Sequence, residues 1–555
     1  MNFRPECRAR WMQHSYYQQL PLQPLGPEAI RALLHDQLGD DPSVAALREL
    51  VHERTRGNPF FIEELVQSLV ESGHLAGARG TYRLTTAIET LPVPASVHAV
   101  LAARIDRLPE REKEVLQTAA VIGRTFSEAL LRRVVANVAA LGEAELGASL
   151  AALAAAEFLF EASLYPQLEY SFKHPLTQEV AQRSQLRERR VRVHAAVAQA
   201  LEEPGGNLDE RAAEIAQHWD EAEDRGRAAR WHRRAAEWAG LADPREGLRH
   251  WRRVRELAPG VPDESERSAL ALEACHQLLS LAWRMGGSEA EAAAVYQEGR
   301  ALAERSGDRA ALALLVGRYS MIRTNMGSAL DGVRYGEEAV LLAQECDDRA
   351  LRAAIGTFPA HAHQVSGDAR ALLDWSARVL AEVGSDDELG KEIVGYSPRA
   401  AMLNARATAI RYLGRLEEAW SQGREAERAA EESRELEVLV WIGSSWVDLA
   451  YARGSRESVL EHGRRSVEIA EKLDNESSRI IAYYTLGLAY LVEGQPAAAR
   501  EALRESAAIA RDRRTLRTFF VLVLARLAEA HLALGERSEA LATAREAIDL
   551  GSADG

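Results

Sequence analysis

The chain has 555 residues, of which 47% are hydrophobic and 6% aromatic, and its net charge is −15 at neutral pH. This composition is typical of a helix-rich protein with several domains, and the acidic excess, which lies almost entirely after residue 200, disfavours nucleic acid and anionic membranes as partners of that region. Cys7, Cys275 and Cys346 lie far apart without CxxC spacing, and no transmembrane-length apolar run or signal peptide is evident, so we expect a cytoplasmic protein.

Three amphipathic segments lie between Pro27 and Gly73, and the last junction reads RTRGNPFFIEELVQSLVESG. Gly57 is suited to ending one helix, and Asn58 to capping the next. Pro59 then falls at the first helical position, where its missing N–H costs nothing. Taken alone, this pattern predicts only a corner between two helices.

Residues 92–190 change from helical to strand periodicity. PASVHAVLAARIDRLPEREKEVLQTAAVIG predicts two helices, SEALLRRVV a third and EAELGASLAALAAAEFL a fourth. FLFEASLYPQLEYSFKH then predicts a β-hairpin with a turn near Pro166. Helices followed by a two-stranded wing indicate a winged helix, and an ordinary α+β linker domain is the alternative.

Six segments in this order carry a family resemblance: FRPE (3–6), SYYQQLPLQPL (15–25), RTRGNPFFIEEL (54–65), VLAARIDRLP (100–109), LQTAAVIGRTF (116–126) and LEYSFKHPLTQEVA (168–181). Together they resemble the C-terminal part of bacterial STAND-type signal-transduction ATPases. In that family an AAA-like ATPase domain often follows a class III nucleotide cyclase domain and precedes tetratricopeptide repeats (TPRs). The resemblance covers about residues 1–260.

The resemblance implies an ATP-driven switch, in which a P-loop core and a helical lid hold the nucleotide, a winged helix relays its state and the repeats sense a partner. By resemblance, Arg4 falls at a sensor arginine, and Gly57, Asn58 and Pro59 match the lid motif whose proline packs near adenine. We assign Phe60 and Phe61 to the core instead. The implied domains are a remnant of the ATPase core (1–25), the lid (26–91) and the winged helix (92–190).

The P-loop itself is missing from the sequence. There is no GxxxxGK[ST], whose backbone N–H groups, lysine and hydroxyl would hold phosphates and Mg²⁺, and no apolar strand with paired carboxylates precedes Arg4. We therefore expect no enzymatic activity and no cofactor in this chain, and ATP or ADP with Mg²⁺ only if an upstream segment completes the core. HExxH, GxSxG and Cys–His metal spacings are also missing, and His361 and His363 do not share a helix face.

Residues 191–265 carry apolar and small residues at helical spacing and predict degenerate repeats that cap a solenoid. Pro259, Gly260 and Pro262 mark a loop before the regular array.

Glycines recur at intervals of 40 to 47 residues in the rest of the chain: Gly287, Gly327, Gly367, Gly414, Gly454, Gly494 and Gly535. Small or β-branched residues recur seven positions before each glycine: Ser280, Ser320, Ala360, Ala407, Val447, Gly487 and Ala528. Others recur twelve positions after it: Gly299, Ala339, Val379, Ala426, Ser466, Ser506 and Ala547. Residues 266–555 therefore resemble a TPR array, a right-handed α-solenoid of about seven helix pairs with a glycine turn in each pair. The TPR period is about 34 residues, so longer helices or linkers are expected.

The overall prediction is a mainly α protein, with a helical lid and a winged helix followed by the solenoid. Its function would be the non-catalytic regulatory part of a STAND-type ATPase, whose partners are a protein or peptide bound by the repeats and an upstream ATPase core. The acidic charge fits either solvated outer helix faces or a basic partner. Membrane is not expected as a partner.

Two alternatives stay open. One is a winged-helix transcriptional regulator with a TPR sensor. We expect no DNA partner, because no lysine or arginine lies between Arg133 and Lys173, although a basic cluster follows at Arg183, Arg187, Arg189, Arg190 and Arg192. The other is part of an ATPase or adenylate cyclase that an upstream segment completes.

Overall fold

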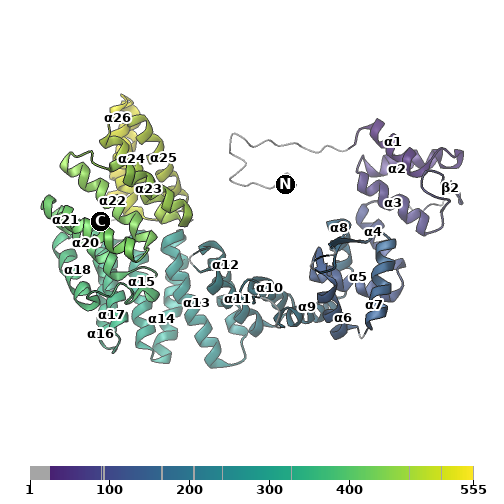
Figure 1. Cartoon of the computed structure of the whole chain (residues 1–555), viewed down its shortest axis with the longest axis horizontal. Helices are drawn as coiled ribbons and strands as arrows, with labels where there is room; N and C mark the ends of the chain where they lie inside the picture. The colour runs from purple at the N-terminus through teal and green to yellow at the C-terminus, as the bar shows by residue number, and fades with distance from the viewer. Residues whose placement is uncertain are drawn as a thin grey trace. The chain divides into compact units, whose positions relative to one another are not determined.

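The structure is a computed structural model. It describes residues 25–88, 91, 94–139, 141–163, 165, 167–203, 207–240, 242–326, 328–473, 475–513 and 515–553. Arg4, Pro166 and Gly327 lie outside these residues. Two compact units make up the chain, residues 1–203 and 204–555, and helices dominate both (Figure 1). The mainly α fold class is thus confirmed, whereas the finer domain boundaries expected near residues 25, 91, 190 and 265 stay predictions.

The first part of unit 1 contains the three helices expected between Pro27 and Gly73. They are α1 (Pro27–Leu38), α2 (Ala45–Thr55) and α3 (Pro59–Glu71). Their apolar faces meet in one core, which includes Leu34, Leu47 and Leu65. A short antiparallel pair, β1 (Leu75–Ala76) and β2 (Arg83–Leu84), follows α3 and was not predicted, because two-residue strands leave no alternating pattern.

Four helices and three strands form the second part of unit 1. They are α4 (Val97–Arg107), α5 (Glu110–Ile122), β3 (Thr125–Ser127), α6 (Glu128–Val138), α7 (Glu143–Ala155), β4 (Leu159–Ser163) and β5 (Glu169–Phe172). The predicted helices and hairpin are confirmed. The sequence reading missed the three-residue strand β3, which pairs with β5 through Phe126 opposite Tyr170 and gives the antiparallel order β3-β5-β4. Unit 1 ends with α8 (Pro175–Arg183) and α9 (Arg187–Glu202).

No single helix among the described residues combines the length and apolar composition of a membrane span. One bent pair, α6 with α7, passes on length and composition, and its two helices meet at 117°.

Unit 2 is a solenoid. It opens with α10 (Ala212–Glu221), α11 (Arg225–Ala239) and α12 (Pro244–Leu257), the helices predicted as degenerate repeats, and a 3-10 turn at Ala258–Gly260. Pairs 1 to 4 are α13 (Glu264–Met285) with α14 (Glu289–Ser306), α15 (Arg309–Met326) with α16 (Ala329–Gln344), α17 (Arg349–Ser366) with α18 (Ala369–Val383), and α20 (Pro398–Tyr412) with α21 (Leu416–Glu432). Pairs 5 to 7 are α22 (Leu436–Arg453) with α23 (Val459–Leu473), α24 (Glu476–Val492) with α25 (Pro496–Arg513), and α26 (Arg517–Ala533) with α27 (Arg537–Ala553). The TPR-like solenoid is thereby confirmed.

The predicted glycine turns are present in five pairs. Their glycines have left-handed φ angles between 64° and 79°: Gly367, Gly414, Gly454, Gly494 and Gly535. In pair 1 the prediction was one residue off, because Gly286, with φ +75°, ends α13. A Cβ atom on Gly286 would lie 2.3 Å from the carbonyl oxygen of Arg513, so this position needs glycine for space as well.

The residues twelve positions after each glycine are buried in all seven pairs. They lie where the second helix approaches a first helix most closely. A Cβ on Gly299 would come within 2.6 Å of Leu315 Cδ1, and Ser506 donates a hydrogen bond of 2.8 Å to the carbonyl of Ile480. Small side chains therefore set the spacing of the helices, as the sequence predicted.

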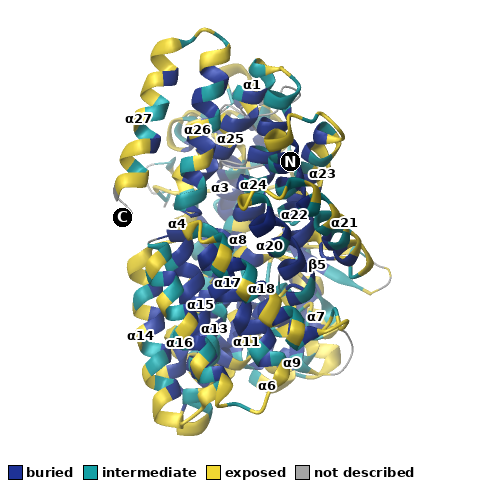
Figure 2. Cartoon of the chain, turned by 90° about the vertical axis from the view of Figure 1, so that its left-hand side faces the viewer, coloured by how far each residue is buried: buried dark blue, intermediate teal, exposed yellow. Residues whose placement is uncertain are grey.

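The first helices of successive pairs pack against one another, whereas successive second helices make no comparable contact. The first helices consequently line the inner side of the curved stack. The first helices of pairs 1 and 2 also contact the first helices of pairs 6 and 7. The solenoid therefore completes about one turn in five pairs. Figure 2 shows the buried residues concentrated within this stack.

The widest glycine spacing, from Gly367 to Gly414, contains an inserted short helix, α19 (Lys391–Val394). It lies on the inner side, where Arg284 donates to the carbonyl of Val394 at 3.3 Å and Arg318 to that of Ile393 at 3.1 Å. Arg284 also forms a buried ion pair with Glu437 of pair 5 at 3.0 Å. The insertion therefore joins the first pairs of the turn to the later ones.

Ala499→Trp in α25 tests this packing. Ala499 is fully buried between helices of pairs 5 to 7, so an indole must push them apart, at a cost of about 1–3 kcal/mol of unfolding free energy. We expect a lower midpoint of thermal unfolding by circular dichroism. Ala497→Trp, at an exposed position of the same helix, is the matched control and should leave the midpoint nearly unchanged. Equal midpoints for both variants would contradict the packing role.

Candidate functional site

The lid motif adopts the local structure that the sequence predicts. Asn58 caps α3 by accepting a hydrogen bond of 3.2 Å from the backbone N–H of Phe61, and Pro59 occupies the first turn. Gly57 has φ +81°, and a Cβ there would lie 2.6 Å from the carbonyl oxygen of Leu25. Asn58 and Pro59 are exposed, so a ligand has access to them. Their contact with a nucleotide stays a prediction, as does that of Arg4, which lies outside the described residues.

The two phenylalanines after the motif have different surroundings. Phe61 is buried in the core of the first three helices, as expected. Phe60 is half-buried and stacks on His174, with ring centroids 3.9 Å apart. His174 caps α8 by accepting from the N–H of Leu176. The start of α3 is therefore joined to the start of α8.

A buried arginine holds the other end of α3. Arg104 of α4 is 2% exposed and forms an ion pair with Glu64 and a bidentate one with Glu71, whose Oε1 lies 2.5 Å from Nη2. It also donates to the carbonyl of Ala156 at 2.8 Å and lies 4.5 Å from the ring centroid of Phe158. This Arg104 cluster ties α3 and α4 to the junction between α7 and β4. Burial raises the pKa of Glu64, and its contact with Arg104 opposes the rise.

Sequence reasoning missed the Arg104 cluster, although Arg104 and Glu64 both stand in segments that carry the family resemblance. The available signal was the position of Arg104 on the apolar face of α4, beside Leu101 and Ile105. A charged residue on such a face needs a buried partner.

A second cluster of polar residues lies on the inner helices of pairs 4 to 7. Tyr484 donates a hydrogen bond of 2.9 Å to Asp448, and Arg411 lies 3.7 Å from the same carboxylate. Arg526 donates to the Tyr451 hydroxyl and to Glu529, each at 2.9 Å. We call these residues the inner polar row: Arg411, Asp448, Tyr451, Tyr484, Arg526 and Glu529.

The inner polar row is only partly buried, and its side chains differ in how fully they are hydrogen-bonded. Burial raises the pKa of Asp448, while the Arg411 guanidinium opposes the rise. Burial also raises the pKa of Tyr484 well above its ordinary value. The 3.7 Å separation of Arg411 and Asp448 is too long for a direct hydrogen bond, so neither side chain is saturated by the other.

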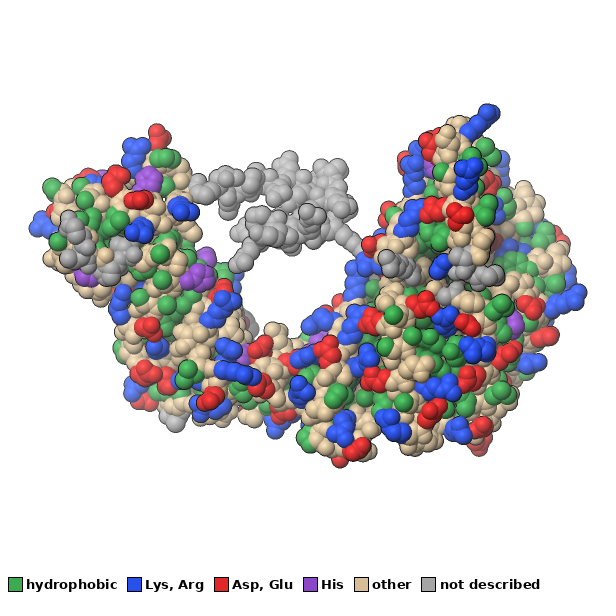
Figure 3. Space-filling view, turned by 180° about the vertical axis from the view of Figure 1, so that it is seen from behind, with side chains coloured by type: hydrophobic (Ala, Val, Ile, Leu, Met, Phe, Trp, Pro, Cys, Tyr) green, Lys and Arg blue, Asp and Glu red, His purple; other side chains and the backbone are tan. Residues whose placement is uncertain are grey.

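The charges elsewhere in the array are largely paired between helices. Ion pairs join second helices of successive pairs, among them Arg300–Glu338, Arg465–Glu431 and Arg511–Glu546. Figure 3 shows acidic and basic side chains interspersed over the face of unit 2 that it presents. The acidic excess is thus spread over paired faces, which favours the solvated-face interpretation of the charge.

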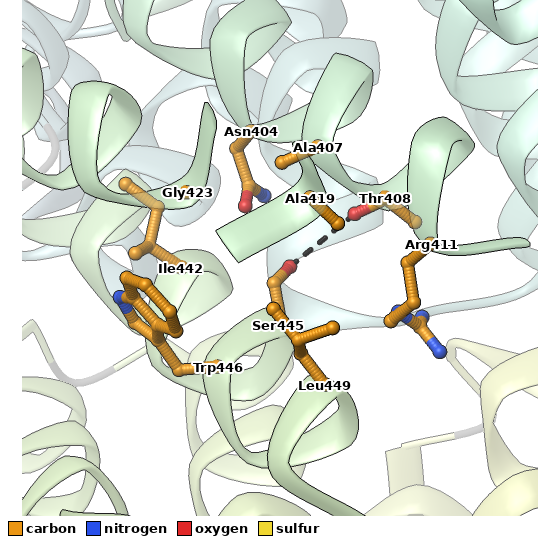
Figure 4. Close-up of a pocket in the computed structure, with 10 residues that line it drawn as sticks. All are labelled: Asn404, Ala407, Thr408, Arg411, Ala419, Gly423, Ile442, Ser445, Trp446 and Leu449. Atoms are coloured by element: carbon orange, nitrogen blue, oxygen red, sulfur yellow. Dashed lines mark hydrogen bonds between the residues drawn. The ribbon is translucent and has the colours of Figure 1, made fainter. Parts of the chain in front are cut away.

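Figure 4 shows where α20, α21 and α22 meet beside the inner polar row. Their side chains enclose a cavity of about 10 Å³, which is the size of one water molecule. Among the described residues, the Oδ1 atom of Asn404, which is 5% exposed, has no hydrogen-bond partner, and neither does Nε of Arg411. The site therefore offers one unused acceptor and one unused donor.

The candidate DNA-reading helix is α7. It carries no lysine or arginine, and its first turn bears Glu143 and Glu145, which pair with Arg132 at 2.6 Å and Arg111 at 3.1 Å. Within the basic cluster that follows, Arg189 pairs with Glu114 at 2.6 Å. The helix itself therefore carries no cation that could neutralise a DNA phosphate, and the arginines beside its start are already paired.

The two histidines weighed as metal ligands have separate partners. His361 lies 3.3 Å from Asn325 Oδ1, and burial lowers its pKa to about 4, while His363 lies 3.9 Å from Glu337. Over the described ranges, no group of three or more His, Cys, Asp or Glu residues is arranged to hold a metal ion.

Comparisons with known proteins give one family and several distant structures. A family model described as a domain of unknown function (DUF8739) matches residues 26–81, which span α1 to β1. No curated protein shows significant similarity to the chain.

Among solved structures, a STAND protein with a tetratricopeptide repeat sensor from Pyrococcus horikoshii is similar over 88% of this chain and 72% of its own, with 11% identity and a TM-score of 0.32. A Rap protein complexed with competence and sporulation factor covers 60% and 98%, with 11% identity and a TM-score of 0.41. Yeast Tom70 covers 66% and 89%, with 11% identity and a TM-score of 0.31. Likenesses this distant assign no function.

Arg104→Met tests the Arg104 cluster. The variant leaves the carboxylate of Glu64 buried without its cation, which costs about 3–5 kcal/mol. We expect the unit 1 transition in urea, followed by circular dichroism on the full chain, to shift to lower denaturant. Adding Glu64→Leu removes the stranded charge and should restore part of the loss. A single variant as stable as the unmodified chain would show that the cluster does not hold α3.

Proposed function

We propose that this chain is the regulatory, partner-binding portion of a STAND-type signal-transduction ATPase, with the repeat array as its sensor. The observation that carries the sensor role is the inner polar row. Its side chains come from first helices of pairs 4, 5, 6 and 7 and meet on the inner side of the solenoid. A set of half-buried charges on a concave surface is suited to recognising a polar partner.

The chemistry of the row favours a peptide or protein segment as the partner. Each residue of an extended backbone offers one donor and one acceptor. The row offers donors at the Arg526 guanidinium and the Tyr451 hydroxyl, and acceptors at the carboxylates of Glu529 and Asp448. The row also contains both signs of charge, which suits a chain of mixed side chains better than a polyanion such as DNA.

The STAND assignment is supported by the order of elements in unit 1. The helices of the proposed lid are followed by α4 to α7 and the antiparallel sheet β3-β5-β4. This order is compatible with the proposed winged helix, whose wing would be β4 and β5. The Arg104 cluster and the Phe60–His174 stack connect the lid to this domain at both ends of α3. On this proposal, a displacement of Pro59 would be transmitted through these two contacts to the winged helix.

Nucleotide binding requires residues that this chain does not supply. Asn58 and Pro59 fit a contact with the base, but the sequence holds no phosphate-binding loop. On this proposal ATP or ADP with Mg²⁺ binds only when a P-loop core is added, and the chain by itself is not an enzyme. An ATPase or cyclase activity belongs to such a completed protein, and a transcriptional role finds no support in the charge of α7.

Photocrosslinking tests the sensor role. A benzophenone amino acid placed at Tyr451, in the inner polar row, should trap a partner in cells that make the full chain, because this side chain is partly exposed. The same probe at Leu341, an exposed position on the second helix α16, is the control and should trap none of that product. Arg411→Ala should reduce the Tyr451 product several-fold. Equal products from both probe positions would argue against an inner-face site.

Calorimetry tests the STAND assignment. The chain as it stands should not bind ATP measurably, since the phosphate cradle supplies most of the recognition. When an ATPase core is added, Arg4→Ala should weaken nucleotide binding by about 1.5–3 kcal/mol through loss of a charge-assisted bond. Pro59→Ala should have a smaller effect. Micromolar ATP binding by the chain alone, or indifference of the completed protein to both variants, would overturn the assignment.

A further inference from the structure

Two buried histidines face each other where α11 packs against α12, at the start of unit 2. His232 of α11 is 4% exposed and His250 of α12 is 1% exposed. Their Nδ1 atoms lie 2.7 Å apart, which is a hydrogen-bond distance. The Nε2 atom of each ring meets a carboxylate, at 2.8 Å from Asp220 Oδ2 of α10 for His232 and at 3.0 Å from Glu246 Oε1 for His250. The four groups therefore form one continuous chain of contacts across three helices.

Among the described residues, the charged groups in contact with the two rings or with their carboxylates come from α10 and α12. Asp220 accepts two hydrogen bonds of 2.9 Å from Arg253, and Glu246 accepts two from Arg249. Although burial disfavours its charged form, the hydrogen bonds from His232 and Arg253 lower the pKa of Asp220 to about 2. The Arg249 guanidinium lowers the pKa of Glu246. Both carboxylates are thus ionised at neutral pH and can only accept hydrogen bonds.

The acceptor-only ends of this chain fix where its protons lie. Each Nε2 must carry a hydrogen, because a bare ring nitrogen would set its lone pair against a carboxylate oxygen. Arg249 Nη2 also lies 3.1 Å from His250 Nε2, but it donates to Glu246 Oε1 at 2.5 Å and so shares that oxygen with the ring. If both histidines were neutral, the two Nδ1 atoms would be bare and would repel each other at 2.7 Å. The short contact therefore requires one further proton between them.

We propose that the His232–His250 pair binds one proton at neutral pH, shared between the two Nδ1 atoms, and that this proton joins α11 to α12. The pair then carries a single positive charge, which lies between the ionised carboxylates of Asp220 and Glu246. A second proton would make two N–H groups face each other. Burial, together with the charge of His232, accordingly lowers the pKa of His250 to about 4. This inference depends neither on the STAND assignment nor on the sensor role.

The shared proton makes the stability of this region depend on pH in both directions. An ordinary histidine has a pKa of about 6.5, so the unfolded pair binds about two protons at pH 5 and almost none at pH 7.5. The folded pair binds about one at both pH values. Unfolding therefore takes up a proton at pH 5, where stability rises with pH, and releases one at pH 7.5, where stability falls as pH rises. On each side, the unfolding equilibrium constant should change by about tenfold per pH unit through this pair.

Proton exchange during urea unfolding of the full chain, measured in weakly buffered solution at pH 5 and pH 7.5, tests the proposal. The comparison is the double variant His232→Gln with His250→Gln, whose amides can hydrogen-bond but do not titrate. The unmodified chain should take up about one proton more than the double variant at pH 5 and release about one more at pH 7.5. His218→Gln is the matched control. Burial lowers the pKa of His218 to about 4, so this change should reduce uptake at pH 5 by about one proton and alter nothing at pH 7.5.

Two neutral histidines would give a difference of about two protons at pH 5 and none at pH 7.5, and that result would overturn the proposal. Equal proton exchange by the double variant and the unmodified chain at both pH values would overturn it as well. A second measurement needs no variant and decides the matter if the double variant does not fold. In the unmodified chain with ¹⁵N-labelled histidine, one strongly deshielded proton coupled to two Nδ1 nuclei should appear at pH 7. Separate N–H signals, each coupled to one Nδ1, would contradict a shared proton.

Discussion

Close approach of helices at one small residue in each pair is the constraint on which the solenoid depends. The position twelve residues after each turn glycine is buried in every pair, and at Gly299 even a methyl group would collide with Leu315. Because this contact repeats, each pair stands in nearly the same relation to the next, and the first helices are drawn together on the inner side. The curvature of the array, and with it the inner polar row, follows from that repeated contact.

The sequence predicted these local contacts because the residues that make them recur at nearly regular intervals along the chain. Nothing in the sequence indicated the closure of the turn, in which pair 1 meets pairs 5 and 6. Arg284 and Glu437 are 153 positions apart, and nothing in the neighbourhood of either residue marks the other as its partner. The 47-residue spacing did indicate an insertion, but only the folded turn shows that α19 lies on the inner side, against Arg284 and Arg318.

In unit 1 the sequence predicted helices, a hairpin and the cap at Asn58, since each depends on residues close together in the chain. It did not predict which side chains join the elements. Arg104 reaches residues 33 to 52 positions away, and a buried ion pair of this kind is a weak source of net stability but a strong constraint on geometry. The Arg104 cluster thus fixes the direction of α3, and the exposed motif at its start is oriented by contacts at both ends of the helix.

The closure of the turn also determines which part of the inner side has space for a partner. On pairs 1 to 3, the inner face is largely taken up within the chain: Arg318 is buried against α19, and its pKa falls to about 9 through burial and the repulsion of Arg284. On pairs 4 to 7, the described residues include no such inserted helix beside Arg411, Asp448 and Tyr451, and Tyr451 is 38% exposed. The later pairs consequently hold the part of the inner side that is left for the partner of the proposed sensor role.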